Sequence, residues 1–173
     1  MDNTTDNTQN ALPEVEATSE VAASEEVKAP TIDTELVAKL TAELEAFNKS
    51  LHTKVYPIKI GTETDLTNLM DFINTKATWK NMEALGIIEV SKVLSDAYTE
   101  GLKDGNIFLQ SLPIQALSFF LSKVEDKGLE SAQNHIKFVK PVDDALKLIK
   151  TDNDTLNKMD SELSAAENGI SLA

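Results

Sequence analysis

Residues 107–124, IFLQSLPIQALSFFLSKV, form the most apolar stretch of a chain that is otherwise acidic and polar. A helix that spans a bilayer needs about 20 largely apolar residues. The first dozen residues of this stretch already contain five that are polar or restrict a helix, namely Gln110, Ser111, Pro113, Gln115 and Ser118. The stretch therefore predicts part of a protein core and not a membrane span.

The helical phase of residues 113–124 separates two neighbouring phenylalanines. At about 100° per residue, the apolar side chains share one arc of the helix: Ile114, Ala116, Leu117, Phe120, Leu121 and Val124. Phe119 falls on the opposite, polar side, so we expect Phe120 in the core and Phe119 facing outward. An outward Phe indicates a protein interface; the alternative is that another element, such as the last helix, covers it.

Residues 54–61, KVYPIKIG, are the clearest strand, with Tyr56, Ile58 and Ile60 on one face. Pro57 lacks the N–H that a central strand would need, which predicts one short edge strand. Such an edge favours strand addition by a partner or a sister subunit, with those three residues in the contact. An intramolecular hairpin is the alternative, and residues 107–109 are a candidate extended partner.

Three helices are expected before the apolar stretch. Asp33 is a suitable N-cap for a first helix, whose apolar residues repeat at 3-4-3-4 spacing: Val37, Leu40, Leu44, Phe47 and Leu51. A second helix spans residues 63–76 behind Thr62, and a third spans residues 79–100 before Gly101. The first half of the third helix is apolar nearly all round, which predicts packing on two sides. Trp79 stands at the corner between the second and third helices, where it is either a partner contact or a core residue.

Pro141 is expected to divide the C-terminal region. The pattern predicts one helix over residues 129–140, a second that begins with Pro141, and a last one over residues 152–167. The last helix has only a narrow apolar seam, so it is either lightly docked or paired with another chain. The predicted fold is thus mainly α: a compact bundle of about six helices with one short edge strand, over a single domain at residues 31–173.

The charge of the chain limits its partners. The formal net charge is −13, all 16 basic residues are Lys, and Cys is absent. This balance argues against nucleic acid and anionic membranes as partners, because both require a basic surface. Residues 1–30 carry seven acidic residues against Lys28 and contain no aromatic residue. They are expected to form an acidic low-complexity arm that is disordered in isolation.

Motifs for catalysis or cofactor binding are not found in the sequence. It contains neither GxxxxGK[ST] nor GxGxxG, and the Ca²⁺-loop-like start at residues 152–155 lacks the required Gly and Glu further on. His52 and His135 have no second ligand at a recognised spacing. We therefore expect no catalytic residues, no cofactor, no metal and no small-molecule substrate, and a protein that is not an enzyme.

These observations favour a non-catalytic structural or assembly subunit that acts through protein–protein interfaces, by binding a partner or by self-association. The Asp-Asn-Thr repeats and the Lys-only, Cys-free composition are compatible with a virus or bacteriophage virion component. The alternative is a small acidic regulator or inhibitor that binds a host protein by mimicking charge. No signal peptide or transmembrane segment is apparent, which predicts a soluble protein in the cytoplasm or in a virion.

Overall fold

The computed structural model describes residues 32–78, 80, 83–124 and 128–169. The N-terminal arm predicted at residues 1–30 and the corner residue Trp79 lie outside the described residues. Within the described part, the elements follow in the order α1 (Thr34–Thr53), β1 (Val55–Lys59), α2 (Glu63–Lys76), α3 (Ala84–Glu100), β2 (Asn106–Gln110), α4 (Ser111–Ser122) and α5 (Leu129–Glu167). The prediction of a mainly helical fold is confirmed, with five described helices instead of about six.

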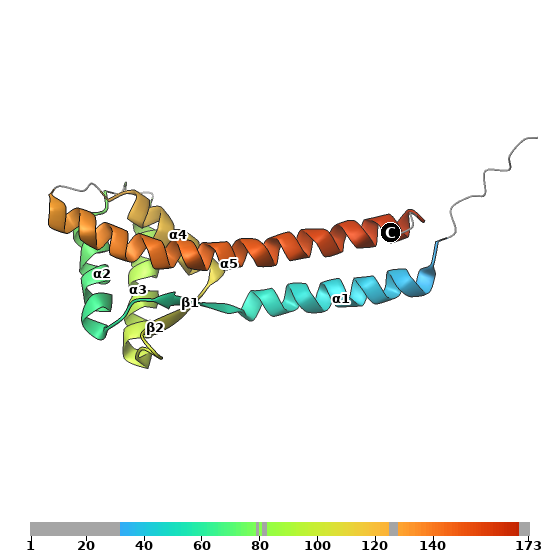
Figure 1. Cartoon of the computed structure of the whole chain (residues 1–173), viewed down its shortest axis with the longest axis horizontal. Helices are drawn as coiled ribbons and strands as arrows, with labels where there is room; N and C mark the ends of the chain where they lie inside the picture. Colours follow the sequence, from blue (N-terminus) through green and yellow to red (C-terminus); the bar gives the residue numbers. More distant parts are fainter. Residues whose placement is uncertain (1–31, 79, 81–82, 125–127, 170–173) are drawn as a thin grey trace, which may run out of the picture.

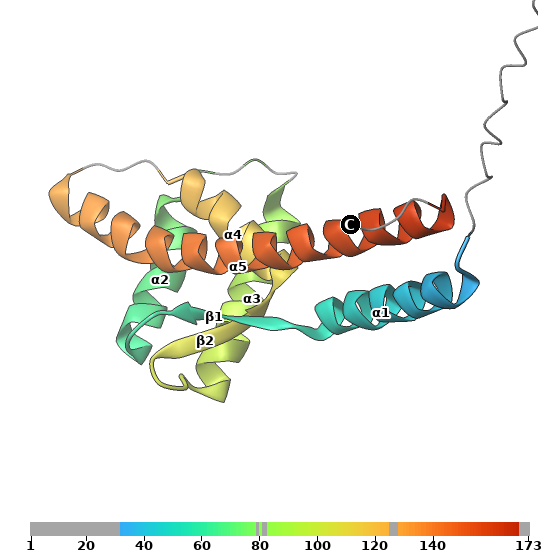
Figure 2. The ribbon, with the colours of Figure 1, turned by 45° about the vertical axis from the view of Figure 1, so that its right-hand side comes forward.

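The elements form a lobe and a projection. The lobe consists of α2, α3, α4, the two strands and the first half of α5 (Figure 1). From it, α1 and the second half of α5 extend side by side in opposite chain directions, as Figures 1 and 2 both show. We call this projecting pair, with the residues that flank the two helices (32–53 and 151–169), the helical hairpin.

Helices α1 and α2 begin at the capping residues that the sequence predicted, whereas α3 begins later than expected. The Asp33 carboxylate accepts hydrogen bonds from the backbone N–H groups of Glu35 and Leu36, both at 3.1 Å, and so caps α1. Thr62 forms a capping box with Asp65 at the start of α2. Helix α3 was expected to begin at residue 79 and begins at Ala84. Lys80 and Glu83 explain the delay, because their backbone and side-chain hydrogen bonds of 2.8 and 2.9 Å close a separate turn before the helix.

Pro141 does not end a helix, so the prediction of a break there is wrong. Helix α5 runs continuously from Leu129 to Glu167 with Pro141 inside it. A proline removes one hydrogen bond inside a helix and costs about 3 kcal/mol. Here the residues on either side of it, Phe138 and Val142, are both buried in the core. Their burial holds both sides of the proline in one helix, and the sequence pattern around Pro141 alone does not show this tertiary contribution.

The edge strand has an intramolecular partner. β1 pairs antiparallel with β2, which places Tyr56 opposite Leu109 and Ile58 opposite Ile107. The expectation of a single strand was therefore wrong, and the suggested pairing with residues 107–109 is confirmed. Beyond the strand ends, the Ile60 N–H donates to the Gly105 carbonyl at 2.9 Å. Hydrogen-bonded pairs alternate along an antiparallel ladder, so Pro57 falls at a non-bonded position and breaks no ladder bond.

The core lies between the inner face of this sheet and helices α2 to α5. Its fully buried large side chains come from every element of the lobe: Ile58, Leu66, Leu69, Ile73, Leu94, Ile107, Ile114, Leu117, Leu121 and Val142. Phe120 is buried and Phe119 is exposed, as the helical phase predicted. The opening apolar stretch thus supplies both β2 and α4, and it is mainly core.

The two faces of β1 provide a stability test. Replacing Ile58, which is fully buried, by Ala is expected to lower the free energy of unfolding by about 2–5 kcal/mol, because it opens a cavity in the core. Val55 lies in the same strand with its side chain exposed, so Val55→Ala is the matched control and should change stability by less than about 0.5 kcal/mol. Urea unfolding measures both variants. Equal effects would contradict the assignment of the inner face.

Candidate interaction surfaces

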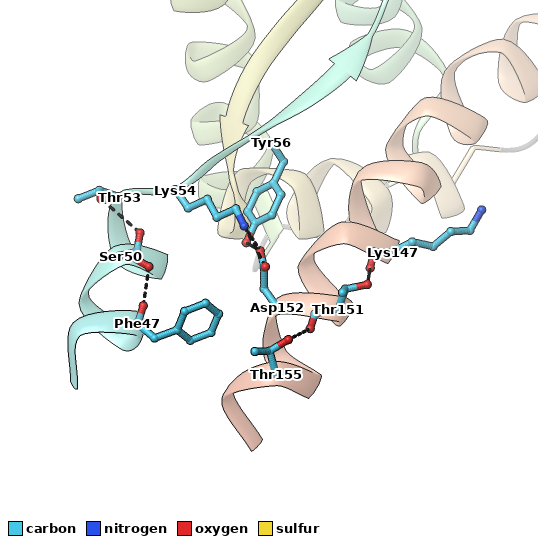
Figure 3. Close-up of polar contacts among 9 residues, drawn as sticks. All are labelled: Phe47, Ser50, Thr53, Lys54, Tyr56, Lys147, Thr151, Asp152 and Thr155. Atoms are coloured by element: carbon cyan, nitrogen blue, oxygen red, sulfur yellow. Dashed lines mark hydrogen bonds and ion pairs between the residues drawn. The ribbon is translucent and has the colours of Figure 1, made fainter. Parts of the chain in front are cut away.

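Three polar side chains join the hairpin to the lobe (Figure 3). Asp152 of α5 accepts a hydrogen bond of 2.7 Å from the Tyr56 hydroxyl on β1 and one of 2.9 Å from the Lys54 ammonium at the end of α1. The Lys54 ammonium also lies 5.4 Å from the centre of the Tyr56 ring, within range of a cation–π contact. We call Lys54, Tyr56 and Asp152 the clasp. The clasp fixes the junction between the end of α1, which runs along α5, and the start of β1.

The clasp shifts the pKa values of its members. Burial and the hydrogen bond to Asp152 raise the pKa of Tyr56 to about 12, so this hydroxyl remains a donor at neutral pH. Burial acts to raise the pKa of the Asp152 carboxyl, but the hydrogen bonds from Lys54 and Tyr56 outweigh it and hold that pKa below its ordinary value. Asp152 is therefore ionised in the folded protein, although its side chain is only 15% exposed.

The apolar seams of the hairpin face each other. Residues of both seams are half-buried, and the Phe47 side chain extends from α1 towards α5 (Figure 3). The α1 seam is Val37, Leu40, Leu44, Phe47 and Leu51, and the α5 seam is Leu156, Met159, Leu163 and Ala166, of which Ala166 is buried. No residue of α1 is fully buried. The narrow seam of the last helical segment is thus lightly docked on the chain's own first helix, one of the two outcomes that the sequence left open.

Charge is divided unevenly between the lobe and the rest of the chain. Residues 54–150 contain 12 Lys and 13 acidic residues, a net charge of −1. The two hairpin segments, residues 32–53 and 151–169, contain three Lys and nine acidic residues, a net charge of −6. Residues 1–31 contribute a further −6. The acidity of the protein therefore belongs to the hairpin and the residues before it, while the lobe is nearly neutral.

The lobe carries an exposed apolar face on α3 and α4. Four large side chains of these two helices are exposed: Leu85 at 80%, Ile88 at 62%, Leu112 at 68% and Phe119 at 43%. On α4, Leu112 and Phe119 lie seven residues apart and so share one stripe. We call Leu85, Leu112 and Phe119, with the groove between the two helices, the α3/α4 face. Ile88 is not part of it, because it lies about 140° around α3 from the groove-lining Val93. Helix α3 packs against α2 and α4, as expected of a helix packed on two sides, but Leu85 and Ile88 in its first half face solvent.

The groove of this face is shallow and mostly apolar. It is lined by Gly86, Glu89, Val90 and Val93 from α3 and by Leu112, Pro113 and Ala116 from α4. The two helices approach closely at Gly86, where an added Cβ would lie 3.4 Å from the Phe120 ring. At one end, the Lys123 ammonium lies 4.8 Å from the centre of the Phe119 ring and 3.4 Å from the Glu83 carboxylate. Phe119 is thereby placed beside the start of α3.

The structure places the predicted partner-binding residues differently. Phe119 is exposed and belongs to the α3/α4 face. Tyr56, Ile58 and Ile60 are buried in the chain's own core, so in this fold their side chains pack against the lobe. Trp79 lies outside the described residues.

Sequence reasoning did not assign two members of this face, Leu85 and Leu112, to an interface, and it did not single out the exposed Ile88 of α3. The available signal was the apolar character of Leu85 and Ile88 outside the main stripe of their helix.

Two further properties concern the described part of the chain only. Across it, no group of three or more His, Asp or Glu side chains is arranged to hold a metal ion. None of its helices is both long and apolar enough to cross a membrane.

Asp152→Asn tests the clasp. The substitution is expected to lower the free energy of unfolding by about 1–2 kcal/mol near pH 7, because it removes the charge that Lys54 and Tyr56 bind. The folded-state pKa of Asp152 lies below its value in the unfolded chain. This stabilisation is therefore present above the unfolded value of about 4 and is lost as the pH falls through the folded value. Urea unfolding near pH 7 and near pH 3 measures the difference between wild type and variant, which should shrink at the lower pH.

Asp154→Asn is the matched control for this experiment, since Asp154 is exposed on the same helix two residues further on. It should leave stability nearly unchanged at both pH values. A destabilisation by Asp152→Asn that is equally large at both pH values would contradict a role for the carboxylate charge.

Comparison with known proteins gives no family assignment for this arrangement. No protein-family model, curated protein or solved structure matches the chain. Functional inference therefore rests on the surfaces described above.

Proposed function

We propose that this protein is a non-catalytic structural or assembly subunit that works through protein–protein interfaces. The observation that carries the proposal is the α3/α4 face, where the large apolar side chains of Leu85, Leu112 and Phe119 are exposed on two adjacent helices. A contiguous apolar patch on a folded protein marks an interaction site more often than a chance accumulation. Its location on a nearly neutral lobe supports binding by apolar contact and not by long-range charge.

The fold supports this proposal in a second way. The hairpin extends the acidic helices away from the lobe (Figures 1 and 2), so the apolar face and the acidic surface lie on different parts of the molecule. A subunit with two separate surfaces can contact two neighbours at once, as an assembly requires. The finer proposal of a virus or bacteriophage virion component is supported by composition alone: Lys as the only basic residue, no Cys, and the Asp-Asn-Thr repeat.

A second candidate function is favoured by the charge distribution. The hairpin and the residues before it carry −12 of the total charge of −13. An acidic regulator that binds a basic protein surface by mimicking charge would present its acids in this concentrated form. Such binding would weaken strongly with added salt, whereas contact through the α3/α4 face would not.

Phe119→Ser tests the proposed function. Tagged full-length protein is expressed in the cells that produce it, and its elution volume in gently prepared extract is measured by size-exclusion chromatography. Wild type is expected to elute in an assembly larger than its own 18.9 kDa, and Phe119→Ser is expected to elute as the free chain. Ile136→Ser is the matched control, because Ile136 is 70% exposed on α5, and this variant should remain in the assembly.

Three results of this experiment have different meanings. Wild type that elutes as a free monomer would contradict the assembly role. An assembly that survives Phe119→Ser, dissolves in high salt and is lost on neutralising the exposed acids Asp154 and Asp160 would favour the acidic regulator instead. An assembly lost with Phe119→Ser and stable in salt supports the proposal.

A further inference from the structure

We infer that the outer edge of β2, the edge away from β1, binds residues 170–173 of a second copy of this chain as an added strand. This contact goes beyond the proposed function, because it uses a surface apart from the α3/α4 face. Three features of the molecule support it: the hydrogen-bonding pattern of the sheet, a pocket beside the edge, and the position at which α5 ends.

The main-chain groups of Phe108 point away from β1. Bonded pairs alternate with non-bonded pairs along the ladder, and the hydrogen bond of 2.9 Å from Ile60 to Gly105 marks one of the bonded pairs. Phe108 lies opposite Pro57, at a non-bonded position, so its N–H and C=O groups both face the outer edge of β2. Within the described residues, no hydrogen bond to either group is found. The residue is 44% exposed, so another chain can approach it.

The chain itself begins a third strand on this edge and then stops. Lys103 and Asn106 pair antiparallel, each N–H donating to the other carbonyl at 3.0 Å. Along the same line, Gly101 would be the next residue to pair, opposite Phe108. Gly101 instead has a φ of 80°, and its N–H donates to the Ala97 carbonyl at the end of α3. The position beside Phe108 is therefore left for another segment.

A pocket lies at this unfilled position. It has a volume of about 360 Å³ and is lined by residues from the end of α3 and from both strands. Its apolar walls are Val55, Ala97, Ile107 and Phe108. A water molecule takes up about 30 Å³ of the liquid, so the pocket has room for an aliphatic side chain and the main chain that carries it.

The other edge of the sheet is less suited to strand addition. Pro57 is the middle residue of β1 and has no N–H to donate to an added strand. β1 also contacts α5. Strand addition, which the sequence suggested for β1, is therefore assigned to β2.

Residues 170–173, Ile-Ser-Leu-Ala, fit this edge better than the other segments outside the described residues. They are uncharged, and Ile170 and Leu172 would share one face of a strand, so both can contact the apolar walls. Residues 1–31 carry a net charge of −6. They are disfavoured because Glu100 and Lys103 balance each other in the pocket, while the carboxyl end of α3 adds partial negative charge.

The added segment must come from a second copy. Asp152 contacts Tyr56 of the sheet, and α5 continues for 15 residues to Glu167, about 22 Å away from the lobe (Figure 1). Four extended residues reach at most about 14 Å, so residues 170–173 do not return to their own sheet. Each copy thus gives one segment and receives another. Such a head-to-tail contact can continue from copy to copy.

Sedimentation equilibrium of the purified full-length chain tests this contact. A four-residue contact should be weak, with a dissociation constant on the order of 100 µM. Over loading concentrations from about 10 µM to 1 mM, the mean mass should rise reversibly from 18.9 kDa and pass twice that value.

Two variants remove the two sides of the contact. Phe108→Pro deletes the free N–H and should raise the dissociation constant at least tenfold, while the pairing with β1 tolerates a proline there as it does at Pro57. Phe108→Val is the matched control, since it keeps the N–H, and should stay within about threefold of wild type. Leu172→Asp puts a charge on the added segment and should also weaken association at least tenfold.

Mixing the two weakened variants tests the head-to-tail arrangement. Phe108→Pro still has an intact segment to give, and Leu172→Asp still has an intact edge to receive it. Each alone should remain near 18.9 kDa, whereas an equal mixture should form a complex of twice that mass that grows no further. Circular dichroism checks that each variant is folded. Leu172→Asp lies outside the lobe, so it decides the outcome if Phe108→Pro unfolds.

Several results would overturn the inference. These are a wild-type chain that stays monomeric at 1 mM, a Leu172→Asp chain that associates like wild type, and a mixture of folded variants that stays monomeric. The proposed function is tested separately, because Phe119→Ser should associate like wild type in this assay. Its loss of association here would place the contact on the α3/α4 face and not on β2. A Phe119-dependent assembly in extract would stand whatever the purified chain does.

Discussion

The length of α5 is the constraint on which the rest of the structure depends. Its 39 residues span about 58 Å, which is longer than the lobe that its first half packs against. The buried side chains of α5 reach along the lobe as far as Ile149. Beyond that point, α1 covers the α5 seam as the other half of the helical hairpin. Asp152 lies between the half of α5 that packs on the lobe and the half that α1 covers. Its contacts with Lys54 and Tyr56 join the end of α1 to the sheet and to α5.

The lobe and the helical hairpin also present two different kinds of surface. The lobe has a packed core, little net charge and an exposed apolar face on α3 and α4. The hairpin has half-buried seams and six net negative charges. Apolar contact acts at short range and is insensitive to salt, whereas charge acts over about 10 Å at moderate ionic strength. The two surfaces can therefore serve different neighbours, and each can be changed by substitutions that leave the other intact.

The sequence predicted what local patterns determine and missed what tertiary packing determines. Capping residues located α1 and α2, and helical phase separated Phe119 from its buried neighbour. Pro141 marked a helix end by local rules, but packing on both sides of it keeps α5 continuous. Alternation predicted a buried face at Tyr56 without showing that the chain's own lobe covers it. Leu85 was visibly apolar, yet a single sequence cannot show which apolar faces find a neighbour. The clasp had no local signal, because Asp152 lies almost 100 residues from Lys54 and Tyr56 in the sequence.

The continuity of α5 through Pro141 is the central claim, and a distance between two spin labels tests it most directly. The chain contains no Cys, so Gln133→Cys with Ser164→Cys gives two labelling sites, both exposed and on opposite sides of the proline. An unbroken helix places 31 residue steps between them, a separation of about 46 Å. Double electron–electron resonance should show one narrow distribution near that value. A broad distribution, or one centred well below it, would mean that the helix breaks at Pro141 and that the hairpin does not extend from the lobe as described.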